Sequence, residues 1–266
     1  MQRHYNLPGL INFRDLGGYP VTDLAGNPRL VKPGRLFRAG HFHDVDDSTQ
    51  QVLQQLGIDT IFDLRNSKER EKRPSRFAET HAPVIHNLEL DPGSGASWKG
   101  LLSQSDSTGK ITLDTQQVEQ VMCTLNTSLV TDHAAVYRQL FEILLAHEPQ
   151  AAVFHCASGK DRTGIAAALL LAALGASRNT LVADYLLTNE YLDTRHHIAR
   201  AMADAGTWLA TVDSAALQAL YEVRAAYINA ALDKIDMEYD SIDAYLADAI
   251  GVGEKQRHLL QERYLV

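Results

Sequence analysis

One segment carries most of the structural information in this chain: Ala151-Ala152-Val153-Phe154-His155-Cys156-Ala157-Ser158-Gly159-Lys160-Asp161-Arg162-Thr163-Gly164. It joins an apolar run, a loop of mostly small residues and the first turn of an Ala/Leu-rich stretch that ends before Gly175. This order predicts a strand, a loop and a helix, which form a right-handed crossover unit of an α/β fold. Because such folds bind ligands at the carboxyl ends of their parallel strands, the loop is expected at a ligand-binding edge.

The loop places a cysteine and an arginine around a short curl of backbone. Five residues separate Cys156 from Arg162, which is enough for several N–H groups to point inward as an anion-binding nest at a helix N-terminus. The amides, the helix dipole and the Arg162 guanidinium all favour the ionised thiolate of Cys156. Arg162 also supplies a planar fork that matches two phosphate oxygens, which a lysine cannot copy. We therefore expect a phosphate above the sulfur, held by Ala157, Ser158, Gly159, Lys160, Asp161 and Arg162.

This loop resembles that of the cysteine-dependent phosphatases with a Cys-x5-Arg motif. The Gly-Lys-Asp-Arg-Thr-Gly version at 159–164 is similar to that of the atypical bacterial tyrosine and lipid phosphatases, a group with a secreted mycobacterial enzyme and a Listeria relative. Other segments are similar to the same group: 12–18, 36–40, 63–65, 182–189 and 239–246. The resemblance covers most of the chain.

The resemblance implies a fold and an activity. The fold is α/β and protein-tyrosine-phosphatase-like, with a central, mostly parallel sheet flanked by helices, a helical lid insertion and a helical C-terminal part. The activity is hydrolysis of phosphotyrosine through a phosphocysteine intermediate, with inorganic phosphate as the product. Phosphoserine, phosphothreonine and phosphoinositides are further expected substrates, and no metal or other cofactor is required.

Individual loop residues can be given expected roles. Arg162 would stabilise the transferring phosphoryl group. Thr163 would either cap the following helix or stabilise the sulfur when it leaves in the second step. His155 precedes the nucleophile, so its side chain should point away and fix the loop by hydrogen bonding. Lys160 would either hold an additional phosphate of an inositol headgroup or support the loop electrostatically.

The proton donor for the leaving oxygen is harder to assign. Many Cys-x5-Arg phosphatases use an aspartate on a separate mobile loop, but this chain has no Trp-Pro-Asp sequence. Asp161 is the first candidate, because the similar phosphatases carry an aspartate at this position. Asp91 is the second, because Asp91-Pro92-Gly93 predicts a turn after an expected strand. Either acid would need a proton at working pH.

Charged residues elsewhere are candidates for supporting the loop. Arg14 and Asp15 are expected to pair within a tight turn, and Asp63 and Arg65 are treated in the same way. The run 68–73 mixes both signs of charge, which favours a solvated helix start or loop, with a phosphate-steering rim as the alternative.

Two further positions have a structural and a functional interpretation. Tyr185 and Asn189 lie one helical turn apart, so they would either brace the loop or pack in the ordinary way. Cys123 lies in a helical pattern and is expected to pack in the core or lid, with a disulfide to Cys156 as a minor alternative.

The hydrophobic pattern predicts one domain, 1–266, with a loop and helical lid insertion at about 91–147. Strands are expected at 36–38, 60–64, 83–88 and 151–154, the second and third of them buried and parallel. Helices are expected at 47–56, 115–126, 132–147, 163–174, 179–203, 214–232, 239–249 and 253–263. The stretch 91–110 is Gly/Ser-rich without periodicity, which favours a functional loop.

Composition excludes several classes of protein. A net charge of −8 argues against a general binder of nucleic acid or anionic membranes, since both require a spread basic surface. No apolar run approaches the roughly 20 residues of a membrane span, so no integral membrane association is expected. The N-terminal residues lack the apolar centre of a signal peptide, which favours the cytoplasm, with export without a classical signal as the alternative. Two cysteines cannot build a disulfide framework.

Three other functions compete with the tyrosine phosphatase interpretation. A phytase or inositol-polyphosphate phosphatase would use the same loop, with Lys160 on an additional phosphate. A phosphate-binding module without turnover would keep Cys156 and Arg162 but lack a working acid. A sulfur-transfer enzyme of the rhodanese type also curls a loop around a cysteine, although Arg162 and the helix-opening Thr163-Gly164 make it the weaker alternative.

Overall fold

The computed structural model describes residues 3–78, 82–91, 114–195, 198–199 and 213–266. Within them the central feature is a five-stranded sheet in the order β1-β4-β7-β5-β6. Its strands are β1 (Arg14–Asp15), β4 (Leu36–Ala39), β7 (Ala151–His155), β5 (Ile58–Asp63) and β6 (Val84–Asn87). Only β1 pairs antiparallel with its neighbour, so the sheet is mostly parallel, which confirms the expected fold class. A separate hairpin pairs β2 (Pro20–Thr22) with β3 (Pro28–Leu30).

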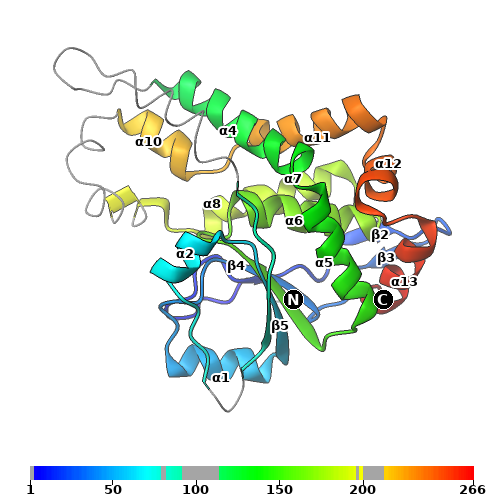
Figure 1. Ribbon diagram of the computed structural model, residues 1–266, viewed down its shortest axis with the longest axis horizontal. Coiled ribbons are helices and arrows are strands. Elements are labelled where there is room, and N and C mark those ends of the chain that lie inside the picture. Colours follow the sequence, from blue (N-terminus) through cyan, green and yellow to red (C-terminus); the bar gives the residue numbers. More distant parts are fainter. Residues whose placement is uncertain (1–2, 79–81, 92–113, 196–197, 200–212) are drawn as a thin grey trace.

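Helices cover the two faces of the sheet very unequally (Figure 1). One face carries α1 (Asp47–Gln55), and the other carries a thick helical layer. The helices of that layer are α4 (Thr115–Thr131), α5 (Ala134–Ala146), α6 (Asp161–Ala173), α7 (Arg178–Leu186), α8 (Thr188–Tyr191), α10 (Ser214–Tyr221), α11 (Ala225–Tyr239), α12 (Ile242–Tyr245) and α13 (Glu254–Tyr264). A π-helical turn, Leu246–Ile250, follows α12, and α2 (Ser67–Lys72) follows β5.

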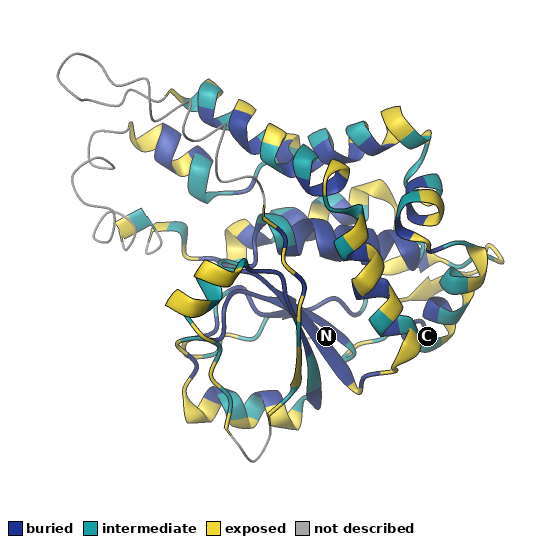
Figure 2. Ribbon diagram, in the orientation of Figure 1, coloured by how far each residue is buried: buried dark blue, intermediate teal, exposed yellow. Residues whose placement is uncertain are grey.

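Strand alternation divides the core between the two faces. Along β7, Val153 joins the cluster under α1, whereas Ala152 and Phe154 join the cluster under the helical layer. The helix α6 is apolar on every side, and Figure 2 shows it dark along most of its length. A helix of that composition is stable only when it is surrounded by protein. This position points the N-terminus of α6, and with it the preceding loop, at the carboxyl ends of the strands.

Two sequence-based expectations for these elements are wrong in part. The strand expected at 83–88 exists as β6, but it lies at the edge of the sheet, and 60% of Val84 and 40% of Ile85 are exposed. The helix expected at 214–232 is interrupted, since α10 ends at Tyr221 and α11 begins at Ala225. No glycine or proline marks this break. Its cause is tertiary, because the Asn189 amide bonds both the N–H and the carbonyl of Val223, each at 2.8 Å.

The region after residue 178 differs from its prediction as well. The single helix expected at 179–203 is divided into α7 and α8, with extended backbone at Leu192. The Gly/Ser-rich stretch expected to form a functional loop lies, apart from Asp91, outside the described residues. Among the residues that are described, no helix is both long and apolar enough to cross a membrane.

Candidate functional site

Three parallel strands end side by side at the position of the loop. His155, the last residue of β7, is in register with Ala39 of β4 on one side and Asp63 of β5 on the other. Cys156 follows directly and is 3% exposed. The loop then runs to Lys160, the N-cap residue of α6. The expected strand, loop and helix are therefore present, with the cysteine between a strand end and a helix N-terminus.

The carbonyl oxygens of the loop point outward to buried donors. Asn12 Nδ2 donates to Gly159 O at 2.8 Å and to Ser158 O at 3.2 Å. Arg38 Nη2 donates to Gly159 O at 2.8 Å, and the backbone N–H of His41 donates to Ala157 O at 3.1 Å. A loop whose carbonyls are satisfied on its outside directs its N–H groups toward its own centre, as an anion-binding nest requires.

Gly159 is required at the tightest point of this curl. Its φ is +67°, a backbone angle that residues other than glycine rarely adopt. A Cβ atom at this position would also lie 2.4 Å from Ala39 O. The glycine thus lets the loop lie directly against the end of β4.

A buried cluster of two arginines and one aspartate holds the outer donors in place. Arg14 Nε donates to Asp184 Oδ1 at 3.3 Å, and Arg38 Nη1 donates to Asp184 Oδ2. Tyr19 also donates to Asp184 Oδ1, at 3.0 Å. Burial alone would raise the pKa of Asp184, but the charges of Arg14 and Arg38 outweigh it and lower the pKa to about 2. The carboxylate is therefore ionised throughout the neutral range and balances two buried cations.

Asp184→Asn is expected to lower the free energy of unfolding by about 3 kcal/mol, because it leaves two buried guanidinium groups without their counter-charge. In the wild type this contribution is fully present above pH about 4 and is lost as the pH falls toward 2, since the folded-state pKa lies below the unfolded one. Urea unfolding at pH 7 measures the loss. Asp233→Asn is the control, because Asp233 pairs with the exposed Arg178 and should leave stability unchanged. Equal stability of the two variants would contradict the structural role of Asp184.

The expected pair between Arg14 and Asp15 does not form. The Asp15 carboxylate instead accepts the backbone N–H groups of Gly17 and Gly34, each at 2.7 Å. The two residues make up the strand β1, and successive side chains of a strand point to opposite faces. Arg14 therefore reaches Asp184 beneath the loop, while Asp15 fixes the turns on the other side.

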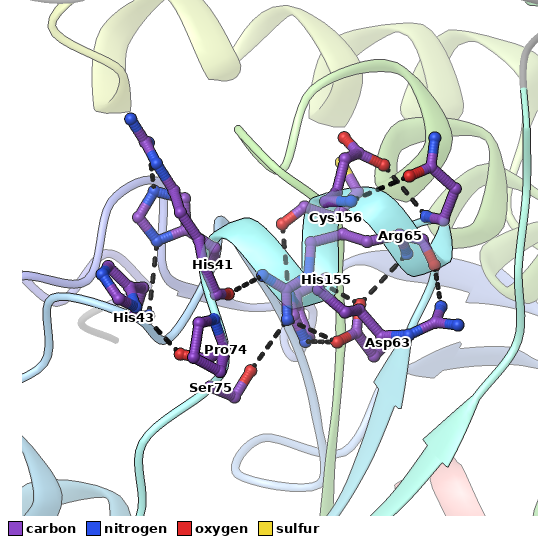
Figure 3. A network of polar contacts seen from close by, with 12 residues as sticks. His41, His43, Asp63, Arg65, Pro74, Ser75, His155 and Cys156 are labelled. Atoms are coloured by element: carbon purple, nitrogen blue, oxygen red, sulfur yellow. Dashed lines mark hydrogen bonds and ion pairs between the residues drawn. The ribbon is translucent and has the colours of Figure 1, made fainter.

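A second polar network lies behind the cysteine (Figure 3). Arg65 binds the Asp63 carboxylate with two nitrogens, at 2.9 and 2.6 Å, and His155 Nε2 lies 3.5 Å from the same carboxylate. His155 Nδ1 lies 3.2 Å from the carbonyl oxygen of Cys156. Burial lowers the pKa of His155 to about 4, so the ring is neutral at pH 7. The neutral imidazole therefore connects the backbone at Cys156 to the Asp63 carboxylate.

Arg65 also connects this network to the segment that follows α2. Its Nη1 donates to the carbonyl oxygen of Arg73 at 2.6 Å, and its Nη2 donates to Ser75 Oγ at 3.0 Å. The side chain of Arg73 makes a further contact, since its Nη1 lies 3.1 Å from His41 Nε2. The base of the loop and the position of α2 are therefore fixed by one set of contacts.

Glu69 of α2 holds the arginine of the loop. Arg162 Nη1 donates to Glu69 Oε2 at 2.6 Å and Nη2 to Oε1 at 2.7 Å, so the guanidinium is gripped by both ends of one carboxylate. Burial alone would raise the pKa of Glu69, but the hydrogen bond and the charge of Arg162 outweigh it and lower the pKa. In turn, Glu69 raises the pKa of Arg162 despite its burial. The pair fixes the plane of the guanidinium. Since Nη1 also donates to Leu90 O at 3.4 Å, an anion would be bound through Nε and the second N–H of Nη2.

Glu69 was not predicted as a site residue, because it lies in the run 68–73, which was interpreted as a solvated helix start or loop. A signal was present, because Asn66 and Glu69 form a capping box at the start of α2. That pattern predicts the helix start and the position of the carboxylate on it. The partner, 93 residues later in the chain, is a consequence of the fold alone.

Asp161 lies at the other side of the loop in a set of polar contacts. Tyr185 OH donates to Asp161 Oδ1 at 2.8 Å, and Lys160 Nζ lies 3.5 Å from Asp161 Oδ2. The Lys160 ammonium also donates to the carbonyls of Leu220 at 2.6 Å and Glu222 at 3.2 Å. Lys160 therefore binds the C-terminal end of α10 in this structure. A second phosphate could engage the ammonium only by replacing these carbonyls.

The two remaining candidates differ in their surroundings. Thr163 is fully buried, and Oγ1 has no hydrogen-bond partner among the described residues. Its expected alternative role as a helix cap is wrong, since the N-cap residue of α6 is Lys160 and no side chain caps this helix. Asp91 is exposed, and its carbonyl oxygen lies 2.8 Å from His133 Nε2. The preceding carbonyl, that of Leu90, reaches Arg162 Nη1 at 3.4 Å.

Comparison with known proteins gives a consistent result. Residues 5–266 match a family described as the tyrosine phosphatase family. The chain is 33% identical to a candidate tyrosine-protein phosphatase of Cupriavidus necator, over 92% of this chain and 83% of the relative. It is 32% identical to the triple specificity protein phosphatase PtpB of Mycobacterium tuberculosis, over 91% of this chain and 92% of the relative. A tyrosine-protein phosphatase of Nostoc commune is 25% identical over 82% of this chain and 69% of its own length.

Proposed function

Because the chain belongs to the tyrosine phosphatase family and is a cysteine-dependent phosphatase, we propose that Cys156 is its nucleophile and that the loop 156–162 binds the phosphoryl group. The observation that carries this proposal is the curl of the loop, with its carbonyls bonded outward to Asn12 and Arg38. A tetrahedral anion in the centre of that curl lies between the sulfur and the guanidinium of Arg162.

The proposed reaction has two steps. The Cys156 thiolate attacks phosphorus, the bond from phosphorus to the ester oxygen breaks, and Asp161 gives its proton to the leaving oxygen. Water then attacks the phosphocysteine, Asp161 takes up a proton from it, and the bond from sulfur to phosphorus breaks to release phosphate. The Thr163 hydroxyl, buried and without a partner among the described residues, donates to the departing thiolate in this second step.

We propose phosphotyrosine in proteins as the first substrate. The name of the mycobacterial relative, a triple specificity protein phosphatase, supports testing phosphoserine and phosphothreonine as well. Phosphoinositides are a further proposed class, and their additional phosphate would have to displace the carbonyls of Leu220 and Glu222 from Lys160.

A substrate panel tests this proposal. It compares phosphotyrosine, phosphoserine and phosphothreonine peptides, phosphoinositides in vesicles and inositol hexakisphosphate, each with and without EDTA. We expect the fastest turnover on phosphotyrosine and equal rates with EDTA. Turnover of inositol hexakisphosphate alone would instead identify a phytase, and no turnover of any substrate would identify a phosphate-binding module.

Glu69→Gln is expected to lower kcat/KM about 10- to 100-fold, because the glutamine amide presents N–H groups to one nitrogen of the Arg162 fork and the guanidinium plane is no longer held. Glu89→Gln is the matched control. Glu89 pairs at an exposed position with Arg70, which lies on α2 like Glu69. The Glu89 variant should therefore keep wild-type activity. Steady-state kinetics on a phosphotyrosine peptide measure both variants, and wild-type activity of Glu69→Gln would show that the pair does not position Arg162.

A further inference from the structure

One oxygen of the Asp161 carboxylate is held by two buried groups from other helices. Tyr185 OH, from α7, lies 2.8 Å from Asp161 Oδ1, and Asn126 Nδ2, from α4, lies 3.4 Å from the same oxygen. Tyr185 and Asn126 are both fully buried. The second carboxylate oxygen, Oδ2, is not part of this set and faces Lys160.

The amide of Asn126 is oriented by its own helix. Its Nδ2 donates to the carbonyl of Met122 at 2.9 Å, which places the N–H₂ end toward Asp161 Oδ1. A flipped amide would set its oxygen against both the Met122 carbonyl and the carboxylate, which is unfavourable. Asn126 therefore faces Asp161 as a donor.

Tyr185 faces Asp161 as a donor too. Burial and then the neighbouring charge of Asp161 raise the pKa of Tyr185 well above its ordinary value, so the phenol keeps its proton at any working pH. Its nearer acceptor is Asp161 Oδ1, at 2.8 Å, rather than Asn126 Oδ1, at 3.5 Å. The ring is fixed as well, since a Cβ atom on Gly164 would lie 2.6 Å from Tyr185 Cδ2.

We propose that Tyr185 and Asn126 are positioning residues for the general acid. With both donors on Oδ1, that oxygen accepts hydrogen bonds and the transferable proton of Asp161 is carried by Oδ2. Lys160 Nζ lies 3.5 Å from Oδ2 but donates to the carbonyls of Leu220 and Glu222, which leaves a lone pair of Oδ2 for this proton. The carboxyl group then presents its proton from one oxygen in one orientation. This inference rests on the proposed role of Asp161 and adds that α4, a helix of the covering layer, contributes to proton transfer through Asn126.

The dependence of the rate on the leaving group tests this proposal. p-Nitrophenol leaves readily as its anion, whereas phenol needs a proton in the transition state. Because kcat/KM reports the steps up to departure of the leaving group, Tyr185→Phe and Asn126→Ala should lower kcat/KM on phenyl phosphate about 10-fold, and kcat/KM on p-nitrophenyl phosphate less than about 2-fold. A merely structural role would lower both rates by the same factor.

Tyr245→Phe is the matched control for the loss of a buried hydroxyl. Tyr245 OH donates to Val130 O at 2.7 Å, so this variant also removes a buried hydrogen bond to α4, about one helical turn beyond Asn126 and away from Asp161 in the contacts of the described residues. It should change the rates on the two substrates by the same factor. Thermal melting of each variant shows how much stability is lost.

Asp161→Asn distinguishes an error in the proposed acid from an error in its proposed positioning residues. If it slows phenyl phosphate far more than p-nitrophenyl phosphate and the Tyr185 and Asn126 variants do the same to a smaller extent, the inference is supported. If only Asp161→Asn shows this difference, the positioning role is wrong and the proposed acid stands. If Asp161→Asn shows no difference, Asp161 is not the acid and both fall.

Discussion

Cys156→Ser is expected to lower kcat by at least about 10⁴-fold, because a serine hydroxyl is protonated at neutral pH and attacks phosphorus far more slowly than a thiolate. The change is nearly isosteric, and Cys156 lies in the loop between β7 and α6 rather than within either element, so the fold should be kept. Activity is measured on a phosphotyrosine peptide, and melting temperature is measured in parallel.

The second cysteine provides the control for this result. Cys123 lies on α4, partly buried, with Sγ 3.6 Å from Ala226 O. Cys123→Ser should keep the activity of the wild type. The serine variant at Cys156 should also still bind the phosphotyrosine peptide, since the loop and Arg162 remain. Activity of Cys156→Ser above a few per cent of wild type, or loss in Cys123→Ser of the same size, would refute the assignment of the nucleophile.

Arg162→Lys is expected to lower kcat/KM by about 10³-fold while keeping the charge. An ammonium group cannot bind the Glu69 carboxylate through two nitrogens and at the same time present a planar fork to phosphate oxygens. Both the orientation of the cation and its bonds to the transferring phosphoryl group are lost. Steady-state kinetics give the size of the effect, and inorganic phosphate as a competitive inhibitor reports the loss of anion binding.

Arg178→Lys is the control for that substitution. Arg178 forms a similar fork with Asp233, Asp236 and Asn229, but on the surface. We expect activity within about 2-fold of wild type, because exposed ion pairs contribute little. A wild-type rate for Arg162→Lys would mean that charge alone is sufficient and that the planar geometry of the guanidinium has no part in catalysis.

The strand, loop and helix around Cys156 could be predicted because their signals are local. The apolar run at 151–154, the glycines of the loop and the Ala/Leu-rich helix each determine structure within a few residues of themselves. The position of β6 at the exposed edge of the sheet could not be predicted in this way. An apolar run has the same sequence in the centre of a sheet and at its edge, and the position of a strand depends on the order in which distant strands pair.

The partners of the charged residues were harder still. The alternation of side chains along β1 is enough to exclude a pair between Arg14 and Asp15, but not to identify Asp184. Glu69 and Asn126 reach the loop from segments 93 and 35 residues away from their partners. Neither residue belongs to a motif with Arg162 or Asp161, so only the fold brings them together.

The scaffold of the loop has a consequence for the order of folding. Arg14 and Asp184 are 170 positions apart, and the buried contact between them helps to hold the side chains that bind the carbonyls of the loop. Contacts of such long range close late, since the entropy of a large loop must be overcome first. During synthesis, the complete cysteine motif leaves the ribosome before Asp184 does. At that stage Arg14 and Arg38 have no counter-charge from Asp184. The enzyme should therefore become active only after most of its length has left the ribosome.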